Sequence, residues 1–173
     1  MKLETLLNPI KLIEAKQVGI IYHFRGWKGT VNIIKTGLIT SGVFNAISFT
    51  RNYQMGTQVN SYVQQEKQIR FVINGDLLSE RYSINPYQNT EDPQIQRKYY
   101  SGSNLYPVHS EAEERIELDL GETIDIRPYL IQVDFLESLI EKLGKRQMVE
   151  TLNELYMPNV PFNIVSKFLP VSN

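Results

Sequence analysis

Cysteine is absent from this chain of 173 residues. The protein therefore has no disulfide framework, no thiolate nucleophile and no zinc or iron–sulfur site with cysteine ligands. The sequence also lacks an apolar run close to the roughly 20 residues that cross a bilayer, and residues 1–16 intersperse polar side chains among the apolar ones, unlike a signal peptide. We therefore expect a soluble, cytoplasmic protein that is not secreted.

An excess of charge of one sign is also missing, because 18 basic residues face 19 acidic ones and the net charge is -1. That balance excludes a protein held to nucleic acid by phosphate neutralisation alone, although a local basic patch stays open. The sequence contains no GxxxxGK(S/T) phosphate loop, GxGxxG fingerprint, HExxH zinc helix or GxSxG nucleophile elbow. The histidines are His23 and His109, with no compact ligand spacing around them, so we expect no metal site.

Apolar residues make up 42% of the chain, enough for a packed core. The length fits one domain and no repeat divides it, so we expect residues 1–173 to form a single domain. Alternating and β-branched residues predict mostly antiparallel strands, at 18–24, 46–51, 69–73, 82–84, 113–118 and 129–135. Helical spacing predicts short helices, at 3–10, 28–36, 136–143 and 148–155. The expected fold class is α+β.

Two local signals mark the ends of these elements. Gly37 suits the left-handed conformation that ends a helix, and Asn74-Gly75-Asp76 is a strong turn signal after the third strand. Apolar residues in 88–110 repeat at neither the spacing of a helix nor that of a strand. A long loop of this sort in a small domain is usually functional or disordered.

The segment IYHFRGWKGTVNIIKTGLI combines a strand that carries Tyr22-His23 with a short helix and a glycine. A strand with Arg51, the loop at 88–110 and a strand opening with Glu113 in AEERI follow in that order. In these features the chain resembles the ADP-ribosyltransferase superfamily, and most closely the DarT-like DNA ADP-ribosyltransferases. It departs from them at Arg25, where the DarT-like pattern usually has a threonine. The resemblance implies a split β-sheet core of the ADP-ribosyltransferase-like fold.

The resemblance implies NAD as the substrate that donates ADP-ribose, with no metal. Cleavage of the bond between ribose and nicotinamide makes an oxocarbenium-like centre that a carboxylate stabilises, as in glycoside hydrolysis. The resemblance gives this catalytic role first to Glu113 and second to Glu111, and it gives the NAD diphosphate to Arg51, whose planar fork suits phosphate oxygens. Strand alternation puts Glu111, Glu113 and Glu117 on one side of the strand and Glu114 on the other.

The resemblance also implies NAD-binding residues on the first two strands. His23, with Tyr22 beside it, would hydrogen-bond a ribose hydroxyl of NAD. Ser48 and Thr50 match the polar positions that brace the nicotinamide pocket in relatives.

The loop at 88–110 is the expected reader of the acceptor. Its Arg97 and Lys98 suit phosphates, while Tyr99 and Tyr100 suit stacking on bases, a combination used for single-stranded nucleic acid such as DNA. The expected acceptor is a nucleic acid base or, as second choice, a protein side chain. The DarT-like resemblance adds the expectation of a toxin, with an antitoxin or a host protein as a further partner.

Each of these residues also has a plainer interpretation. A histidine on an apolar strand is often structural, Arg51 can lie on the surface, and the glutamates at 111–117 can form a solvated face. The alternative function is a degenerate ADP-ribosyltransferase-like module that binds a nucleotide or a partner protein without turnover, as a phage accessory factor. A third interpretation, an RNA 2′-phosphotransferase, requires a basic phosphate cluster that the sequence does not clearly offer.

Overall fold

The computed structural model describes residues 18–42, 45–54, 68–86, 113–144, 146, 148–150 and 159–171. Its strands are β1 (Ile20–Arg25), β2 (Leu38–Thr40), β3 (Ala46–Thr50), β4 (Ile69–Asn74), β5 (Asn85–Pro86), β6 (Glu113–Glu117), β7 (Thr123–Asp125), β8 (Leu130–Leu136) and β9 (Phe162–Val165). Its helices are α1 (Trp27–Thr36), α2 (Gly75–Ser79), the 3-10 turn η3 (Arg127–Tyr129) and α4 (Glu137–Leu143).

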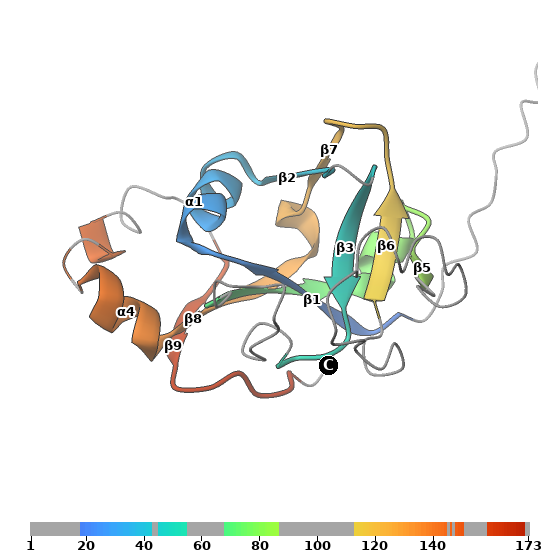
Figure 1. The fold of residues 1–173 in the computed structure, drawn as a ribbon. Coiled ribbons are helices and arrows are strands. Elements are labelled where there is room, and N and C mark those ends of the chain that lie inside the picture. Colours follow the sequence, from blue (N-terminus) through green and yellow to red (C-terminus); the bar gives the residue numbers. More distant parts are fainter. Residues whose placement is uncertain are drawn as a thin grey trace, which may run out of the picture.

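Seven of the strands form one sheet in the order β5-β6-β3-β1-β4-β8-β9, and β2 pairs with β7 in a second, two-stranded sheet (Figure 1). Every pairing is antiparallel except that of β8 with β9, which is parallel. The prediction of an α+β fold with a mostly antiparallel sheet is therefore confirmed. No helix in the described ranges is long and apolar enough to cross a membrane.

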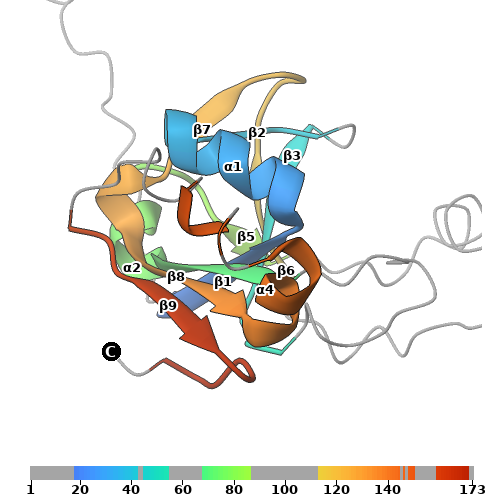
Figure 2. The same ribbon diagram turned by 90° about the vertical axis from the view of Figure 1, so that its left-hand side faces the viewer.

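The main core lies on one face of the large sheet. Ile69, Phe71 and Ile73 of β4 are fully buried in it, at the alternate positions that share a strand face. Ile33 and Ile34 of α1 belong to the same cluster, as do residues of α2, α4, β2 and β7. Figure 2 shows α1, β2 and β7 on this side of the sheet.

A second, smaller core lies on the opposite face. Tyr22, Phe24 and Val72 contribute to it from β1 and β4, and Phe168 covers them from the C-terminal segment, residues 166–171. Figure 2 shows this segment on the side of the sheet away from α1. The face of β1 that holds Tyr22 is thus covered by residues from the end of the described chain.

Most of the predicted elements are confirmed, within two residues of their expected bounds. They are β1, α1, β3, β4, β6, β8 and α4. Gly37 ends α1 in the left-handed conformation with a φ of 73°, as expected. Residues 146 and 148–150 are helical, in agreement with part of the predicted helix at 148–155.

One local prediction is wrong. Residues 82–84 are not a strand, and the short strand β5 begins after them at Asn85. The third strand stops at Asn74, where the turn signal predicts its end. The chain then enters α2, and the Asn74 side chain caps this helix by accepting a hydrogen bond from the Leu77 N–H. The sequence patterns also missed β2, β7 and β9. The predicted helix at 3–10 and the loop at 88–110 lie outside the described residues.

Candidate functional site

Strands β1, β3 and β6 lie side by side and carry several of the predicted site residues. Tyr22 of β1 pairs with Thr50 of β3, and Thr50 pairs in turn with Glu113 of β6. We call these three positions the tyrosine row. The row joins residues that are far apart in the sequence, and local sequence signals could not predict its register.

The next positions along the same strands form a second row. Phe49 pairs with Glu114, and the antiparallel step from Tyr22 and Thr50 brings His23 opposite Phe49, with ring centroids 5.7 Å apart. We call His23, Phe49 and Glu114 the histidine row. Because successive residues of a strand belong to opposite faces, this row lies on the face of the main core. All three of its side chains are buried.

The two ring nitrogens of His23 both have hydrogen-bond partners. Nε2 lies 2.8 Å from Nε of Arg25, and Nδ1 lies 2.9 Å from the carbonyl oxygen of Ser48. A guanidinium can only donate, so Nε2 is the acceptor and the proton is on Nδ1, which donates to Ser48. A ribose hydroxyl that donates to Nε2 would therefore have to replace Arg25.

Burial lowers the pKa of the Arg25 guanidinium from its ordinary value. Arginine's ordinary pKa is so high that Arg25 stays charged at neutral pH. The position where the chain departs from the DarT-like pattern thus holds a cation against the predicted ribose-binding histidine. The sequence alone assigns no role to Arg25.

Arg51 lies just after β3 and forms an ion pair with Glu114, with Nη2 2.8 Å from Oε1. The side chain of Arg51 is 48% exposed and that of Glu114 is 6% exposed. A buried carboxylate needs a charged or hydrogen-bonding partner, which Arg51 supplies from the solvent side. Sequence reasoning gave Glu114 no role, and the register that places it beside Arg51 is not visible in local patterns.

Tyr22 and Thr50, two of the predicted NAD-binding residues, are buried and hydrogen-bonded within the fold. The Tyr22 hydroxyl accepts a hydrogen bond from the Val171 N–H at 3.3 Å, and its ring packs 4.8 Å from the Arg70 guanidinium. The Thr50 hydroxyl oxygen accepts from the Asn52 N–H at 3.0 Å. Ser48, by contrast, is exposed.

Most of the remaining predicted site residues lie outside the described residues. The backbone of Glu113 is described and pairs with Thr50. Glu111 and the predicted substrate residues of the loop, Arg97, Lys98, Tyr99 and Tyr100, are not described. The role of the loop as reader of the acceptor stays a prediction.

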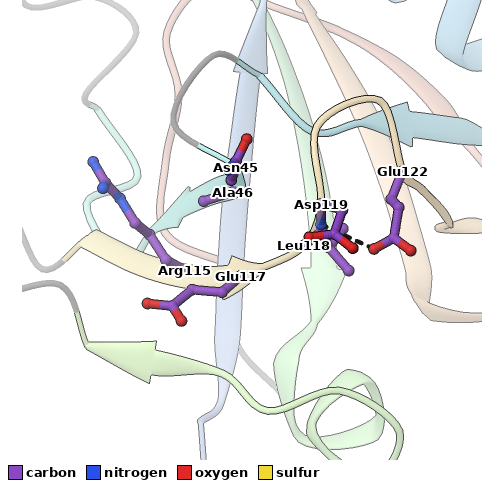
Figure 3. Close-up of a pocket in the computed structure, with 7 residues that line it drawn as sticks. All are labelled: Asn45, Ala46, Arg115, Glu117, Leu118, Asp119 and Glu122. Atoms are coloured by element: carbon purple, nitrogen blue, oxygen red, sulfur yellow. Dashed lines mark hydrogen bonds between the residues drawn. The ribbon is translucent and has the colours of Figure 1, made fainter.

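An open hollow of about 450 Å³ lies at the end of β6 that leads to β7 (Figure 3). Its lining combines three carboxylates with one guanidinium and includes none of the predicted site residues: Asn45, Ala46, Arg115, Glu117, Leu118, Asp119 and Glu122. An acidic lining repels the diphosphate of NAD, so this hollow does not suit that substrate. No group of histidine, aspartate and glutamate side chains in the described part of the chain is arranged to hold a metal ion.

No protein-family model matches the sequence, and no curated protein matches it.

Proposed function

We propose that this chain transfers ADP-ribose from NAD to a nucleic acid base or, as second choice, to a protein side chain. One observation carries the proposal. Strand register brings together residues 22–23, 48–51 and 113–114, which lie far apart in the sequence. These segments hold the histidine, hydroxyl, arginine and glutamate groups that recognise ribose hydroxyls, a diphosphate and a cationic sugar centre.

The proposed reaction needs no group beyond these side chains and the two substrates. The bond between C1′ of the ribose and the ring nitrogen of nicotinamide breaks, and its electron pair stays on that nitrogen. A carboxylate stabilises the positive charge that develops at C1′. An N–H or O–H group of the acceptor then bonds to C1′ and loses its proton to a carboxylate or to water. The products are the ADP-ribosylated acceptor, nicotinamide and a proton, formed in the cytoplasm.

NAD labelled in its adenylate phosphate tests this proposal. The wild-type chain is incubated with single-stranded DNA, with RNA and with a protein mixture, and free nicotinamide is measured in parallel. We expect label on one acceptor class and an equal amount of nicotinamide. The double variant Glu113→Gln/Glu114→Gln should lose both signals, whereas Glu117→Gln, an exposed change on the same strand, should keep them. A wild-type chain that releases no nicotinamide with any acceptor would contradict the proposal.

The burial of Tyr22, His23 and Thr50 favours a second candidate, the degenerate module that binds without turnover. A nucleotide in contact with these residues would require the groups that cover them to move. Calorimetry with NAD, combined with the nicotinamide assay, separates the two functions. Binding without release of nicotinamide favours the module, and release favours the transferase.

A further inference from the structure

The two glutamates that open β6 belong to different rows. Glu113 pairs with Thr50 in the tyrosine row, and Glu114 pairs with Phe49 in the histidine row. Glu114 therefore shares a sheet face with His23. The tyrosine row contains Tyr22, whose hydroxyl accepts a hydrogen bond from the Val171 N–H of the C-terminal segment.

The buried carboxylate of Glu114 forms an ion pair with Arg51, a side chain that is half-exposed to solvent. Glu114 is 6% exposed, whereas Arg51 is 48% exposed. A carboxylate withdrawn from water interacts more strongly with a developing positive charge than one in bulk solvent. The pair also fixes the direction of the carboxylate, since Nη2 of Arg51 is 2.8 Å from its Oε1.

Phe49 lies between His23 and Glu114 in the histidine row and is 2% exposed, as part of the main core. Neighbouring strands are about 4.8 Å apart, so two strand steps separate the backbones of His23 and Glu114 by about 10 Å. A ribose that reaches both side chains therefore requires the groups that cover this row to move, and it would then place its hydroxyls toward His23 and its C1′ toward Glu114. Glu113 does not have this relation to His23, because it lies in the tyrosine row.

We infer that Glu114, and not Glu113, is the carboxylate that stabilises the ribose centre, and that Arg51 is its positioning residue instead of a ligand of the NAD diphosphate. The inference rests on the proposed function. In the transfer step the C1′–nicotinamide bond breaks with its electron pair on nicotinamide, and a nitrogen or oxygen atom of the acceptor bonds to C1′. The proton of the acceptor passes to Glu114 or to water.

Single substitutions in the full chain separate the two glutamates. Glu114→Gln keeps the size of the side chain and removes its charge, and it should lower the rate of nicotinamide release by about 10²–10³-fold. Glu113→Gln should lower that rate by much less than Glu114→Gln does, because Glu113 lies in the tyrosine row and does not share a sheet face with His23. The control is Glu117→Gln, an exposed change on the same strand that should keep the wild-type rate. Urea unfolding of both variants shows whether either has lost the fold. The second variant, Glu114→Asp, keeps the negative charge but shortens the side chain and moves the carboxylate away from the ribose centre. It should therefore also release nicotinamide slowly.

The role of Arg51 is tested by measuring whether its substitutions change kcat or the Kd for NAD. A positioning residue should lower kcat when changed to Gln while the calorimetric Kd for NAD stays within about twofold, and Arg51→Lys should recover part of kcat. A ligand of the diphosphate should instead weaken NAD binding by at least about tenfold when changed to Gln.

The outcomes are distinguishable. A much larger loss of turnover in Glu114→Gln than in Glu113→Gln, with activity kept in Glu117→Gln, supports the inference. The reverse pattern, or equal loss in both folded variants, overturns it and leaves the proposed function standing. Weakened NAD binding with unchanged kcat in Arg51→Gln overturns the positioning role. A wild-type chain that neither binds NAD nor releases nicotinamide overturns the proposed function, and this inference with it.

Discussion

Two arginine–aspartate pairs differ sharply in burial. Arg70 and Asp134 are 2% and 1% exposed, and Nη2 of Arg70 is 2.6 Å from Oδ2 of Asp134. Arg70 also donates hydrogen bonds to the carbonyl oxygens of Tyr53 and Leu169. Its guanidinium lies over the rings of Tyr22 and Phe168, 4.8 Å from each centroid. This arginine therefore joins the sheet to the C-terminal segment.

Removal of Arg70 should strongly destabilise the fold. In Arg70→Met, Asp134 keeps its hydrogen bonds from Gln132 and Asn163 but loses the charge that compensates it. An uncompensated buried charge costs about 3–5 kcal/mol of unfolding free energy, which urea denaturation measures. The double variant Arg70→Met/Asp134→Leu should recover part of the loss, because it buries no charge. A single variant as stable as wild type would show that this pair does not stabilise the fold.

The exposed pair of Asp125 and Arg127 is the matched control. Its side chains are 38% and 58% exposed, so water and salt screen their attraction. Arg127→Met should therefore leave the urea midpoint close to that of wild type. A loss comparable with that of Arg70→Met would contradict the argument from burial.

The same exposed pair predicts a pH effect at one residue. The hydrogen bonds from the Arg127 side chain lower the pKa of Asp125, and the pairing raises the pKa of Arg127. Because the folded pKa of Asp125 lies below its unfolded value, its contribution to stability is present above the unfolded pKa and is lost as pH falls through the folded pKa. NMR titration of the Asp125 carboxyl should give a midpoint below that of an ordinary aspartate, and Arg127→Gln should raise it. An unchanged midpoint in the variant would contradict this cause.

At the scale of elements, the predictions that were confirmed depend on local sequence. In α1, Ile33 and Ile34 face the core, and the glycine that follows the helix takes the left-handed conformation. Signals of this kind lie within a few residues of one another. The missed strands β2 and β7 have three residues each, too few for a periodic pattern, and each is defined by its pairing with the other.

Gly37 offers a test of this local control at the end of α1. Its φ of 73° is strained for any side chain, and a Cβ there would lie 2.6 Å from Cδ of Arg127. Arg127 is exposed and can move, so the backbone conformation should decide the result. Gly37→Ala should cost about 1–2 kcal/mol of unfolding free energy, as measured by urea denaturation.

Gly42→Ala is the control for that change. A Cβ at Gly42 meets nothing within 4 Å, and its φ is outside the left-handed range. Its stability should equal that of wild type or rise slightly, because alanine restricts the unfolded chain. Equal effects of the two substitutions would contradict the role given to the left-handed conformation.

The candidate site was predictable only in part for the same reason. His23, Arg51 and the glutamates of β6 stand out in short motifs, which sequence reasoning can find. The partners that the structure gives them, Arg25 for His23 and Glu114 for Arg51, depend on side-chain contacts and on strand register. A shift of one residue in that register would exchange the faces of Glu113 and Glu114, and the motif alone cannot decide between the two.

At the scale of the whole molecule, the class of fold was predictable but the order of its strands was not. Composition and alternation indicate an antiparallel sheet with short helices. The sheet order instead depends on pairings between distant segments, such as β8 with β9, whose residues Val133 and Phe162 lie opposite each other. The C-terminal segment adds another distant contact through Tyr22. Such contacts join segments that are far apart in the sequence, so local sequence patterns cannot predict them.

This arrangement predicts a gradient of stability across the sheet. β4 lies between β1 and β8, and its residues from Ile69 to Ile73 are all buried, whereas β9 is an edge strand whose Ile164 is 54% exposed. Opening of an edge exposes little apolar surface, but opening of β4 requires the sheet to separate. In native-state hydrogen exchange, amides of β4 should therefore exchange only through global unfolding, with the full urea dependence. Amides of β9 should exchange at least about tenfold faster and with a weaker urea dependence. Equal rates and equal urea dependence in the two strands would instead mean that the parallel edge and the central strands unfold as one unit.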